Sequence, residues 1–407
     1  MSKYHLRCTQ CGEVVPDFAT WFSQNQSCKC GSKRAVAEYS TDYNKLKTLI
    51  EAKAPENFYL YFDFLPFENF DNVISFGEGT IPIENWTYLE NFAKEKYDID
   101  CKVLVYRNDL NGGTNTFKDV AASLAATIFK ENGIKDFCVA STGNTATAYS
   151  RYLALAGIDF TVFVPKCVNP DTVEAILRYG QNVMVCDGDY SFAKQRAAAF
   201  HEDNEVLISA GNIDPIRVEA KKTMVFEFMR QLGRIPDVYI QAVSGGTGPI
   251  AVEKGISEIG DIFPEAKLPR MLLVQQDTCD PMVQGWERAK TSGFKDGWEK
   301  DYPIIDNPQT IVSILSTGNP GMFPVVAPIV KKSGGTFLRV PENNLAQIAK
   351  IAKDQCGVYF GPAAAVCLAG FYQALQNGEI HNGETVLINT GEGIRRASSF
   401  KEMVDNA

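Results

Sequence analysis

From about residue 100 onward, short apolar runs alternate with longer segments in which apolar residues recur every three or four positions. The short runs are rich in β-branched and aromatic side chains and predict strands, whereas the longer segments predict amphipathic helices. Near-continuous apolar strands joined by helices are typical of parallel sheets covered on both faces. The body of the chain is therefore predicted to be α/β with two parallel-sheet domains. We expect strands at 102–106, 137–140, 160–164, 183–186, 206–209, 238–243 and 271–275, and helices at 119–132 and 145–156.

Composition and charge narrow the class of protein. The 407 residues are 45% hydrophobic and 22% charged, which is the mix of a globular chain with two or three structural units. A net charge of −9 without a basic run argues against a nucleic-acid partner. No apolar stretch approaches the roughly 20 residues of a membrane span. Eleven scattered cysteines fit thiols in a reducing compartment, so we expect a cytoplasmic enzyme that binds neither membrane nor nucleic acid.

The first 40 residues differ from the rest because they carry two close cysteine pairs. Cys8 and Cys11 form the first pair, and Cys28 and Cys30 form the second. Two such pairs are typical of a zinc ribbon, in which four thiolates bind the metal tetrahedrally. We therefore predict a zinc-ribbon-like segment at 1–40 with a structural zinc. Free thiols, or a ribbon that has lost its metal, are the alternatives.

Two glycine-containing segments at predicted strand ends carry candidate chemistry. The polar loop 111–118 ends in Lys118 at a helix start, where the helix field and burial both disfavour the ammonium form and favour a nucleophilic amine. A surface lysine near a helix cap is the alternative. The second segment follows the strand at 238–243 and suits a single phosphate, because glycines let backbone N–H groups wrap an anion at a helix start. A flexible turn is its alternative. Its residues are Gly245, Gly246, Thr247 and Gly248.

Two further strand ends carry hydroxyl groups. The segment 141–145 offers hydroxyls, an amide and helix-start N–H groups that suit a carboxylate, although the same residues also make a good helix cap. Thr390 follows the apolar run 387–389 and offers a hydroxyl to a heteroaromatic nitrogen. A reactive lysine, a phosphate cradle and such a hydroxyl together predict pyridoxal phosphate, which needs a lysine Schiff base, a phosphate site and a partner for its ring nitrogen.

At this point the chain resembles a known family over most of residues 74–396. It is similar to the threonine synthase branch of fold-type II pyridoxal phosphate enzymes, whose fold is that of the tryptophan synthase β subunit. The segments that carry the resemblance are Phe76-Gly-Glu-Gly-Thr-Ile-Pro82, Thr116-Phe-Lys-Asp119, 141–145, 211–223, 245–248, 313–320 and 357–363.

The resemblance implies a role for each candidate residue. Lys118 would form the Schiff base and act as the catalytic base, and Arg217 would bind the substrate phosphate. The remaining cofactor ligands would be Asn144 at the ring hydroxyl, Thr390 at the ring nitrogen, and Gly245, Gly246, Thr247 and Gly248 at the phosphate. The substrate would be held by Ser141, Thr142, Gly143 and Thr145. The larger, cofactor-binding domain would comprise 41–118 and 220–407, the smaller, substrate-binding domain would comprise 119–219, and the relatives suggest a homodimer.

Departures from the threonine synthase pattern bear on the reaction. Asn115, Thr116 and Val120 stand where those enzymes usually carry other residues around the lysine, and Gly361 replaces a glutamate. Several segments resemble the cysteate synthases instead: 62–66, 241–248, 268–270 with Gln275, and 279–282. The sequence therefore predicts a cysteate synthase, which converts O-phosphoserine and sulfite to L-cysteate and phosphate. The alternatives are a threonine synthase acting on O-phosphohomoserine and water, and a non-enzyme, either an inactive amino-acid sensor or a zinc-ribbon interaction protein.

Overall fold

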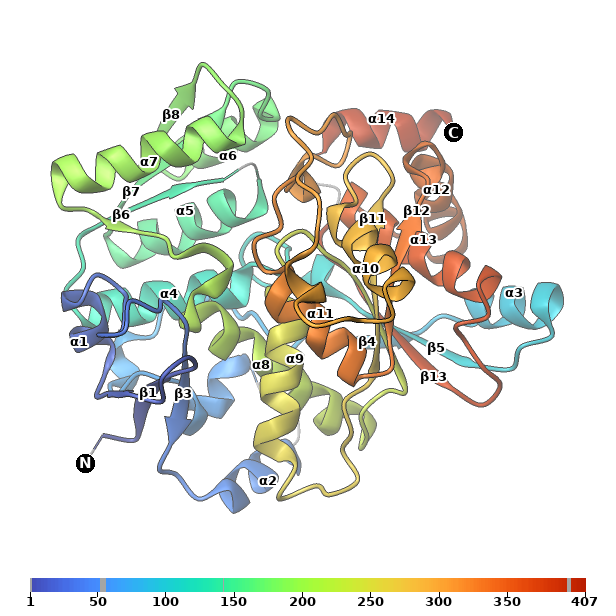
Figure 1. Ribbon diagram of the computed structural model, residues 1–407, viewed down its shortest axis with the longest axis horizontal. Coiled ribbons are helices and arrows are strands. Elements are labelled where there is room, and N and C mark those ends of the chain that lie inside the picture. The colour runs from blue at the N-terminus through green and yellow to red at the C-terminus, as the bar shows by residue number, and fades with distance from the viewer. Residues whose placement is uncertain (1, 52–55, 142, 394–396) are drawn as a thin grey trace.

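The computed structural model describes residues 2–51, 56–141, 143–393 and 397–407, which build three sheets connected by helices (Figure 1). The N-terminal sheet is antiparallel with the strand order β2-β1-β3. Its strands are β1 (Tyr4–Cys8), β2 (Val14–Val15) and β3 (Ala35–Tyr39).

The largest sheet has six strands in the order β12-β11-β10-β13-β5-β4. All neighbours pair in parallel except β4, which runs antiparallel to β5 at the edge. Its parallel strands are nearly continuous runs of buried side chains because helices cover both faces. The strands are β4 (Ile83–Asn85), β5 (Lys102–Tyr106), β10 (Val238–Ala242), β11 (Arg270–Gln276), β12 (Thr336–Val340) and β13 (Thr385–Asn389).

The third sheet has four parallel strands in the order β8-β7-β6-β9, all within residues 119–219. They are β6 (Asp136–Ala140), β7 (Asp159–Pro165), β8 (Asn182–Cys186) and β9 (Leu207–Ile208). The strands and helices expected from the apolar pattern all form, with ends that differ by one or two residues. The helices of this region are α4 (Asp119–Glu131), α5 (Asn144–Ala156), α6 (Pro170–Arg178) and α7 (Tyr190–Asn204).

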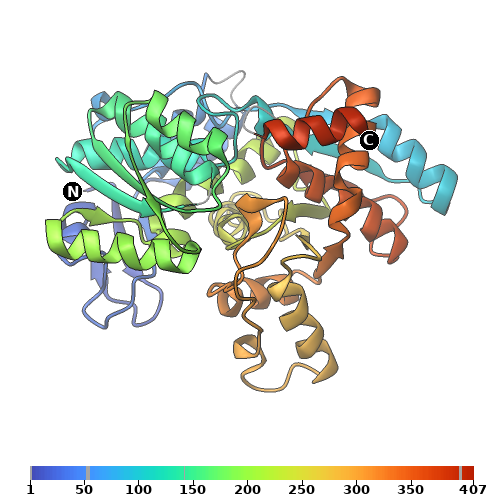
Figure 2. The same cartoon turned by 90° about the horizontal axis from the view of Figure 1, so that it is seen from above.

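Helices α8 and α9 lie between the two parallel sheets, which flank them in the view from above (Figure 2). The helices outside the four-stranded region are α1 (Phe18–Ser23), α2 (Tyr43–Glu51), α3 (Thr87–Tyr97), α8 (Pro215–Leu232), α9 (Thr247–Ile259), α10 (Pro281–Thr291), α11 (Phe323–Lys332), α12 (Leu345–Cys356), α13 (Pro362–Gln376) and α14 (Ser398–Asn406). Short 3₁₀ helices lie at Phe58–Phe64, Phe70–Asn72, Asn108–Leu110, Gly211–Ile213, Trp298–Lys300, Ser313–Leu315 and Glu342–Asn344.

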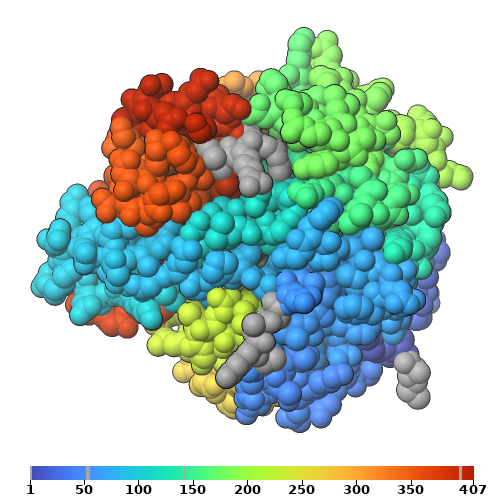
Figure 3. All heavy atoms as spheres, turned by 180° about the vertical axis from the view of Figure 1, so that it is seen from behind, coloured from blue at the N-terminus to red at the C-terminus, as the bar shows by residue number. Residues whose placement is uncertain are grey.

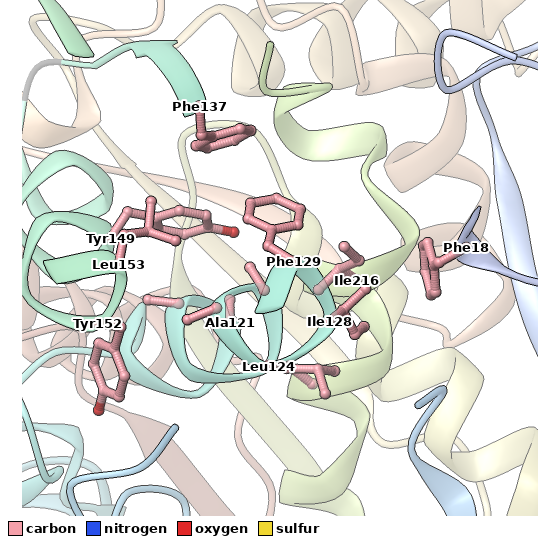
Figure 4. Packing of buried hydrophobic residues seen from close by; sticks show 14 of the residues in the cluster. Phe18, Ala121, Leu124, Ile128, Phe129, Phe137, Tyr149, Tyr152, Leu153 and Ile216 are labelled. Atoms are coloured by element: carbon pink, nitrogen blue, oxygen red, sulfur yellow. The ribbon is translucent and has the colours of Figure 1, made fainter. Parts of the chain in front are cut away.

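One hydrophobic core joins the N-terminal sheet to the four-stranded region (Figure 4). Phe129 of α4 packs against Phe137 of β6, with ring centroids 4.8 Å apart, and Phe18 of α1 lies on the side of α8 that carries Ile216. Burial of each such aromatic side chain stabilises the fold by roughly 1.5–3 kcal/mol. The N-terminal sheet is therefore part of the packed body of the protein.

Polar contacts also connect the N-terminal sheet to α8 and α9. Lys222 of α8 is completely buried and forms ion pairs with Glu219 at 2.6 Å and with Glu258 of α9 at 2.8 Å. Glu219 also accepts hydrogen bonds from the backbone N–H of Ala37 at 3.0 Å and from the hydroxyl of Tyr39 at 2.7 Å. Glu258 also forms an ion pair with Lys254 at 2.7 Å, so loss of Lys222 would leave the buried Glu219 uncompensated. This network fixes β3 to the middle of α8.

In the view from behind, the light-blue to cyan surface that includes α3 and β5 lies next to the orange and red surface of the C-terminal helices (Figure 3). In the described part of the chain, no helix combines the length and the apolar character needed to cross a membrane.

Candidate active site

A cavity of about 620 Å³ opens at the strand ends of both parallel sheets. It is lined by the residues that follow β6 and β10 and by the first residues of α5, α8 and α9. Ligand sites of open parallel sheets lie outside the carboxyl ends of the strands. The sequence-predicted residues that line this cavity are Lys118, Ser141, Gly143, Asn144, Thr145, Arg217, Gly245, Gly246, Thr247 and Gly248. Thr142 lies outside the described residues.

Lys118 directly precedes α4, and Asp119 organises the loop before it. The Asp119 carboxylate accepts hydrogen bonds from the backbone N–H groups of Thr114 at 2.8 Å and Thr116 at 2.7 Å, and from the Thr114 hydroxyl at 2.7 Å. Gly113 has a φ of +83° within this loop, and a Cβ there would lie 2.3 Å from the hydroxyl oxygen of Tyr152. The folded loop therefore holds the backbone of Lys118 rigidly at the cavity.

The Lys118 amine is held partly in its uncharged form. Burial, followed by the positive charge of Arg217, lowers its pKa to about 8, and the Glu392 carboxylate opposes this shift. An ordinary lysine has a pKa near 10.4, so at neutral pH the Lys118 amine is nucleophilic to a much greater extent. This agrees with the direction expected from its place at a helix start.

Ser141 and Asn144 shape the loop between β6 and α5. The Ser141 hydroxyl accepts a hydrogen bond from the backbone N–H of Ala146 at 3.2 Å, so it caps the helix as well as facing the cavity. The side-chain amide of Asn144 donates to the carboxylate of Glu392. The same carboxylate accepts from the backbone N–H of Ala363 at 3.2 Å. Glu392 therefore links the strand end of β13 to the start of α5.

The glycine loop before α9 is closed against Asn212. A Cβ at Gly245 would lie 1.7 Å from the side-chain nitrogen of Asn212, and Gly246 has a φ of +78°. The Thr247 hydroxyl donates to the side-chain oxygen of Asn212 at 3.0 Å. The first N–H groups of a helix have no partner within it, so this loop offers them to an anion. A side chain at 245 therefore fits only if Asn212 turns away or the loop moves.

Thr390 is not brought into the cavity. Its hydroxyl donates to the backbone oxygen of Tyr106 at 2.8 Å and accepts from the backbone N–H of Asn108 at 2.9 Å. These bonds fix Thr390 between β13 and β5, and the place of its hydroxyl at the ring nitrogen of a cofactor stays a prediction. Its neighbours Asn389 and Gly391 line the cavity, together with Cys367.

Arg217 lies in the first turn of α8 and is 7% exposed. Its guanidinium donates to the hydroxyl of Ser209 at 2.8 Å, and its Nε lies 4.0 Å from the carboxylate of Asp214. Within the described chain the Nε is buried without a hydrogen-bond partner. The guanidinium is therefore positioned by its neighbours while part of its donor capacity is still unused.

Sequence reasoning missed three residues of the site. Lys221, Asn212 and Glu392 face or support the cavity and were not predicted to do so. The spacing of Lys221 was an available signal, because residues four apart lie on one face of a helix and Arg217 is four positions earlier. Glu392 had no such signal, since only the meeting of β13 with α5 gives its carboxylate a role.

The four predicted metal ligands come together at one end of the N-terminal sheet. The sulfur atoms of Cys8, Cys11, Cys28 and Cys30 all lie within 4.8 Å of one another. The Sγ atoms of Cys8 and Cys30 are 3.7 Å apart, and those of Cys11 and Cys28 are 3.5 Å apart. Four thiolates at this spacing suit a tetrahedral metal ion.

The cavity fits pyridoxal phosphate on two independent grounds. Lys118 supplies a buried amine of lowered pKa for covalent attachment. The loop 245–248 supplies helix-start N–H groups in a cradle that a Cβ at Gly245 would fill. Two parallel sheets with these groups between them define a fold-type II, threonine synthase-like enzyme dependent on pyridoxal phosphate.

Sequence comparison identifies the family. The model of the family described as "Pyridoxal-phosphate dependent enzyme" matches residues 74–391, so the chain belongs to that family. The chain is 26% identical over 396 residues to the threonine synthase of Methanocaldococcus jannaschii, covering 96% of this chain and 92% of that protein. It is 27% identical over 393 residues to the threonine synthase of Methanosarcina acetivorans, covering 95% and 91%.

Solved structures share the fold at low sequence identity. Diaminopropionate ammonia lyase from Escherichia coli superposes with a TM-score of 0.65 at 16% identity, covering 81% of this chain and 88% of that one. Maize serine racemase gives a TM-score of 0.63 at 16% identity, covering 81% and 92%. The α/β architecture predicted from the sequence is thereby confirmed, and the chain is an enzyme of this family.

Proposed function

We propose that this enzyme releases phosphate from an O-phospho amino acid, with O-phosphohomoserine and water giving threonine and phosphate. The observation that carries the proposal is that one cavity joins Lys118, the glycine cradle and Arg217. Two anion sites on either side of an amine suit a phosphorylated cofactor and a phosphorylated substrate. The named relatives, which align with nearly the whole chain, favour threonine over the cysteate product that the sequence pattern favoured.

The proposal assigns a task to the predicted residues of the cavity. Pyridoxal phosphate, when bound, withdraws electrons from the α-carbon of the amino acid. Lys118 anchors the cofactor and moves the proton at the α-carbon, for which a pKa of about 8 is well matched to neutral pH. Ser141, Gly143 and Thr145 bind the substrate carboxylate at the start of α5. Arg217 neutralises the departing phosphate.

Three further assignments complete the proposed site. Thr142, whose place is outside the described residues, and Asn144 keep their proposed roles at the substrate carboxylate and the ring hydroxyl. Gly245, Gly246, Thr247 and Gly248 are proposed to hold the cofactor phosphate. Borohydride reduction of the holoenzyme followed by peptide mapping tests the anchor: we expect the reduced cofactor on Lys118. An adduct on another residue would contradict the assignment.

A second reaction, O-phosphoserine with sulfite giving L-cysteate and phosphate, is favoured by one specific observation. The cavity contains a further buried cation, Lys221, beside Arg217 and Lys118. A reaction with an anionic nucleophile uses such a charge, whereas attack by water does not require it.

One assay distinguishes the two reactions. Phosphate release is measured with O-phosphohomoserine alone and with O-phosphoserine plus sulfite, and the amino acid formed is identified by mass spectrometry. Lys118→Ala is the control, since it should release no phosphate from either substrate. Threonine formation at a kcat/KM at least tenfold above that for cysteate supports the first reaction, and the reverse ratio supports the second. Absence of phosphate release from both substrates would refute the proposed function.

The cysteine cluster is proposed to hold structural zinc. Four sulfur atoms within 4.8 Å support this assignment, and closed four-thiolate sites leave no open position for catalysis. Metal analysis of the purified protein should give one zinc per chain. A value near zero in protein purified without chelators would contradict it.

The domain division and assembly are proposals as well. We propose that 119–219 binds the substrate and that 41–118 with 220–407 binds the cofactor, supported by the separate four-stranded sheet within 119–219. A homodimer and a cytoplasmic location stay predictions; analytical ultracentrifugation tests the first.

A further inference from the structure

Lys221 is a buried cation that the proposed roles leave without a task. It lies in the middle of α8, is 3% exposed, and lines the cavity. Among the described residues, none hydrogen-bonds to or forms an ion pair with its ammonium group. The Nζ of Lys221 lies over the ring of Phe117, 4.7 Å from the ring centroid. A buried lysine is normally paired, because an isolated charge is costly to remove from water.

Arg217 and Lys221 lie on the same face of α8. They are four residues apart, which places their side chains one above the other. Both line the cavity, and the Nε of Arg217 is also buried without a hydrogen-bond partner within the described chain. Two adjacent cations therefore present unused donors to the same space.

The surrounding charges do not balance this pair. Asp214 is the carboxylate nearest to Arg217, at 4.0 Å, and it also caps α8 by accepting from the backbone N–H of Ile216 at 2.9 Å. Lys118 is a third basic group near Arg217 and Lys221. Burial, Lys118 and Arg217 together hold the pKa of Lys221 well below its usual range, whereas Asp214 opposes them. An anion beside Lys221 would restore its charged form.

We propose that Lys221 and Arg217 form an oxyanion subsite that takes a group carrying two negative charges. Two cations match the charge of a phosphate ester or of sulfite, and their five- and three-donor head groups suit a compact oxyanion. The identity of the oxyanion rests on the proposed function. It is either the ester phosphate of the substrate or a free oxyanion that acts as nucleophile.

The first experiment measures anion binding and does not depend on turnover. Inorganic phosphate and sulfite are titrated separately by calorimetry into the holoenzymes of the wild type, Lys221→Met and Lys221→Arg. Loss of a charged hydrogen-bond donor should weaken binding of the anion about 10- to 100-fold in Lys221→Met, and Lys221→Arg should retain most of the affinity. Lys96→Gln is the matched control, because Lys96 is exposed and does not line the cavity; we expect a change of less than about threefold for this surface charge.

A second readout separates binding from folding. Without added anion, Lys221→Met should melt at or above the wild-type temperature, because it removes a buried amine that no described neighbour hydrogen-bonds. Added phosphate should raise the melting temperature of the wild type and leave that of Lys221→Met nearly unchanged. A lysine with a merely structural role would give a lower melting temperature in Lys221→Met and an unchanged response to phosphate.

The outcomes divide cleanly. Equal phosphate and sulfite affinities in the wild type and Lys221→Met would overturn the proposal. Weaker binding of pyridoxal phosphate in Lys221→Met, with unchanged anion binding to its holoenzyme, would overturn it too, since Lys221 would then serve the cofactor. A raised KM for the phospho amino acid alone identifies the ester phosphate as the occupant, whereas a raised KM for sulfite alone identifies the nucleophile. Anion binding that depends on Lys221 in an enzyme that turns over neither substrate would support the subsite while the proposed function fails.

Discussion

Replacement of Gly245 by alanine tests the glycine cradle directly. The added Cβ would lie 1.7 Å from the side-chain nitrogen and 2.3 Å from the Cγ of Asn212, whereas carbon atoms make favourable contacts at about 3.5–4.0 Å. An overlap of that size cannot be absorbed by small shifts. Either Asn212 turns away and gives up its hydrogen bond to Thr247, or the loop moves outward.

The magnitude follows from these two alternatives. Outward movement of the loop costs about 1–3 kcal/mol, as overpacking does, whereas rotation of Asn212 gives up a hydrogen bond that contributes about 0.5–1.5 kcal/mol. A penalty of about 0.5–3 kcal/mol that falls on the cofactor-binding loop weakens pyridoxal phosphate binding about 2- to 140-fold. Titration of the apoenzyme with cofactor, followed by visible absorbance, measures this change.

Gly260→Ala is the matched control at the other end of α9. Gly260 has a φ of −59°, and its added Cβ would lie 3.5 Å from the backbone oxygen of Ile256, an ordinary contact distance. This variant should bind the cofactor like the wild type and gain up to about 1 kcal/mol of stability, because alanine restricts the unfolded chain. The double variant Gly245→Ala, Asn212→Gly removes the overlap and should recover part of the affinity. Wild-type affinity in Gly245→Ala, or no recovery in the double variant, would refute the reasoning.

Three further predictions concern other parts of the molecule. The rate at which the apoenzyme attaches pyridoxal phosphate should rise with pH and level off above a pH of about 8, because the uncharged amine of Lys118 reacts and its pKa is about 8. Stopped-flow absorbance measures this rate. A midpoint of the pH profile above 10 would contradict the prediction. Lys222→Met should lower the free energy of unfolding by about 3–5 kcal/mol in denaturant titrations, since it removes the ion-pair partner of the buried Glu219, while Glu258 keeps its pair with Lys254; exposed Lys96→Met should change it by less than about 0.5 kcal/mol. Removal of metal by a chelator should lower the melting temperature, because binding free energy at the cysteine cluster contributes to folding; an unchanged value would argue against a bound ion.

The strands, the helices, Lys118 and the glycine loop of the cavity could be predicted because each depends on local sequence. The apolar run at 102–106 and the cap-and-stop signals around α4 are read within a few residues, and β5 and α4 form there. Lys118 and the loop 245–248 carry their chemistry in consecutive residues, so their arrival at one cavity needed only the rule that strand ends share an edge.

The remainder depends on contacts between distant segments. The direction of the Thr390 hydroxyl is set by the backbone of Tyr106 and Asn108, nearly three hundred positions away in the chain, as the paired strands β13 and β5 dictate. Glu392 gains its partner Asn144 only when β13 meets α5. The isolation of Lys221 from counter-charges is likewise a property of the whole cavity, which no short segment reveals.

The attachment of β3 to α8 has a consequence for how the metal and the chemistry are related. Helix α8, whose Glu219 accepts hydrogen bonds from the N-terminal sheet, also carries Arg217 and Lys221, two residues before and two residues after Glu219. If the cysteine segment unfolds when it loses its metal, Arg217 and Lys221 would bind the proposed oxyanion more weakly, while the glycine cradle would be less affected. Loss of the metal would therefore raise the KM for the substrate before pyridoxal phosphate dissociates.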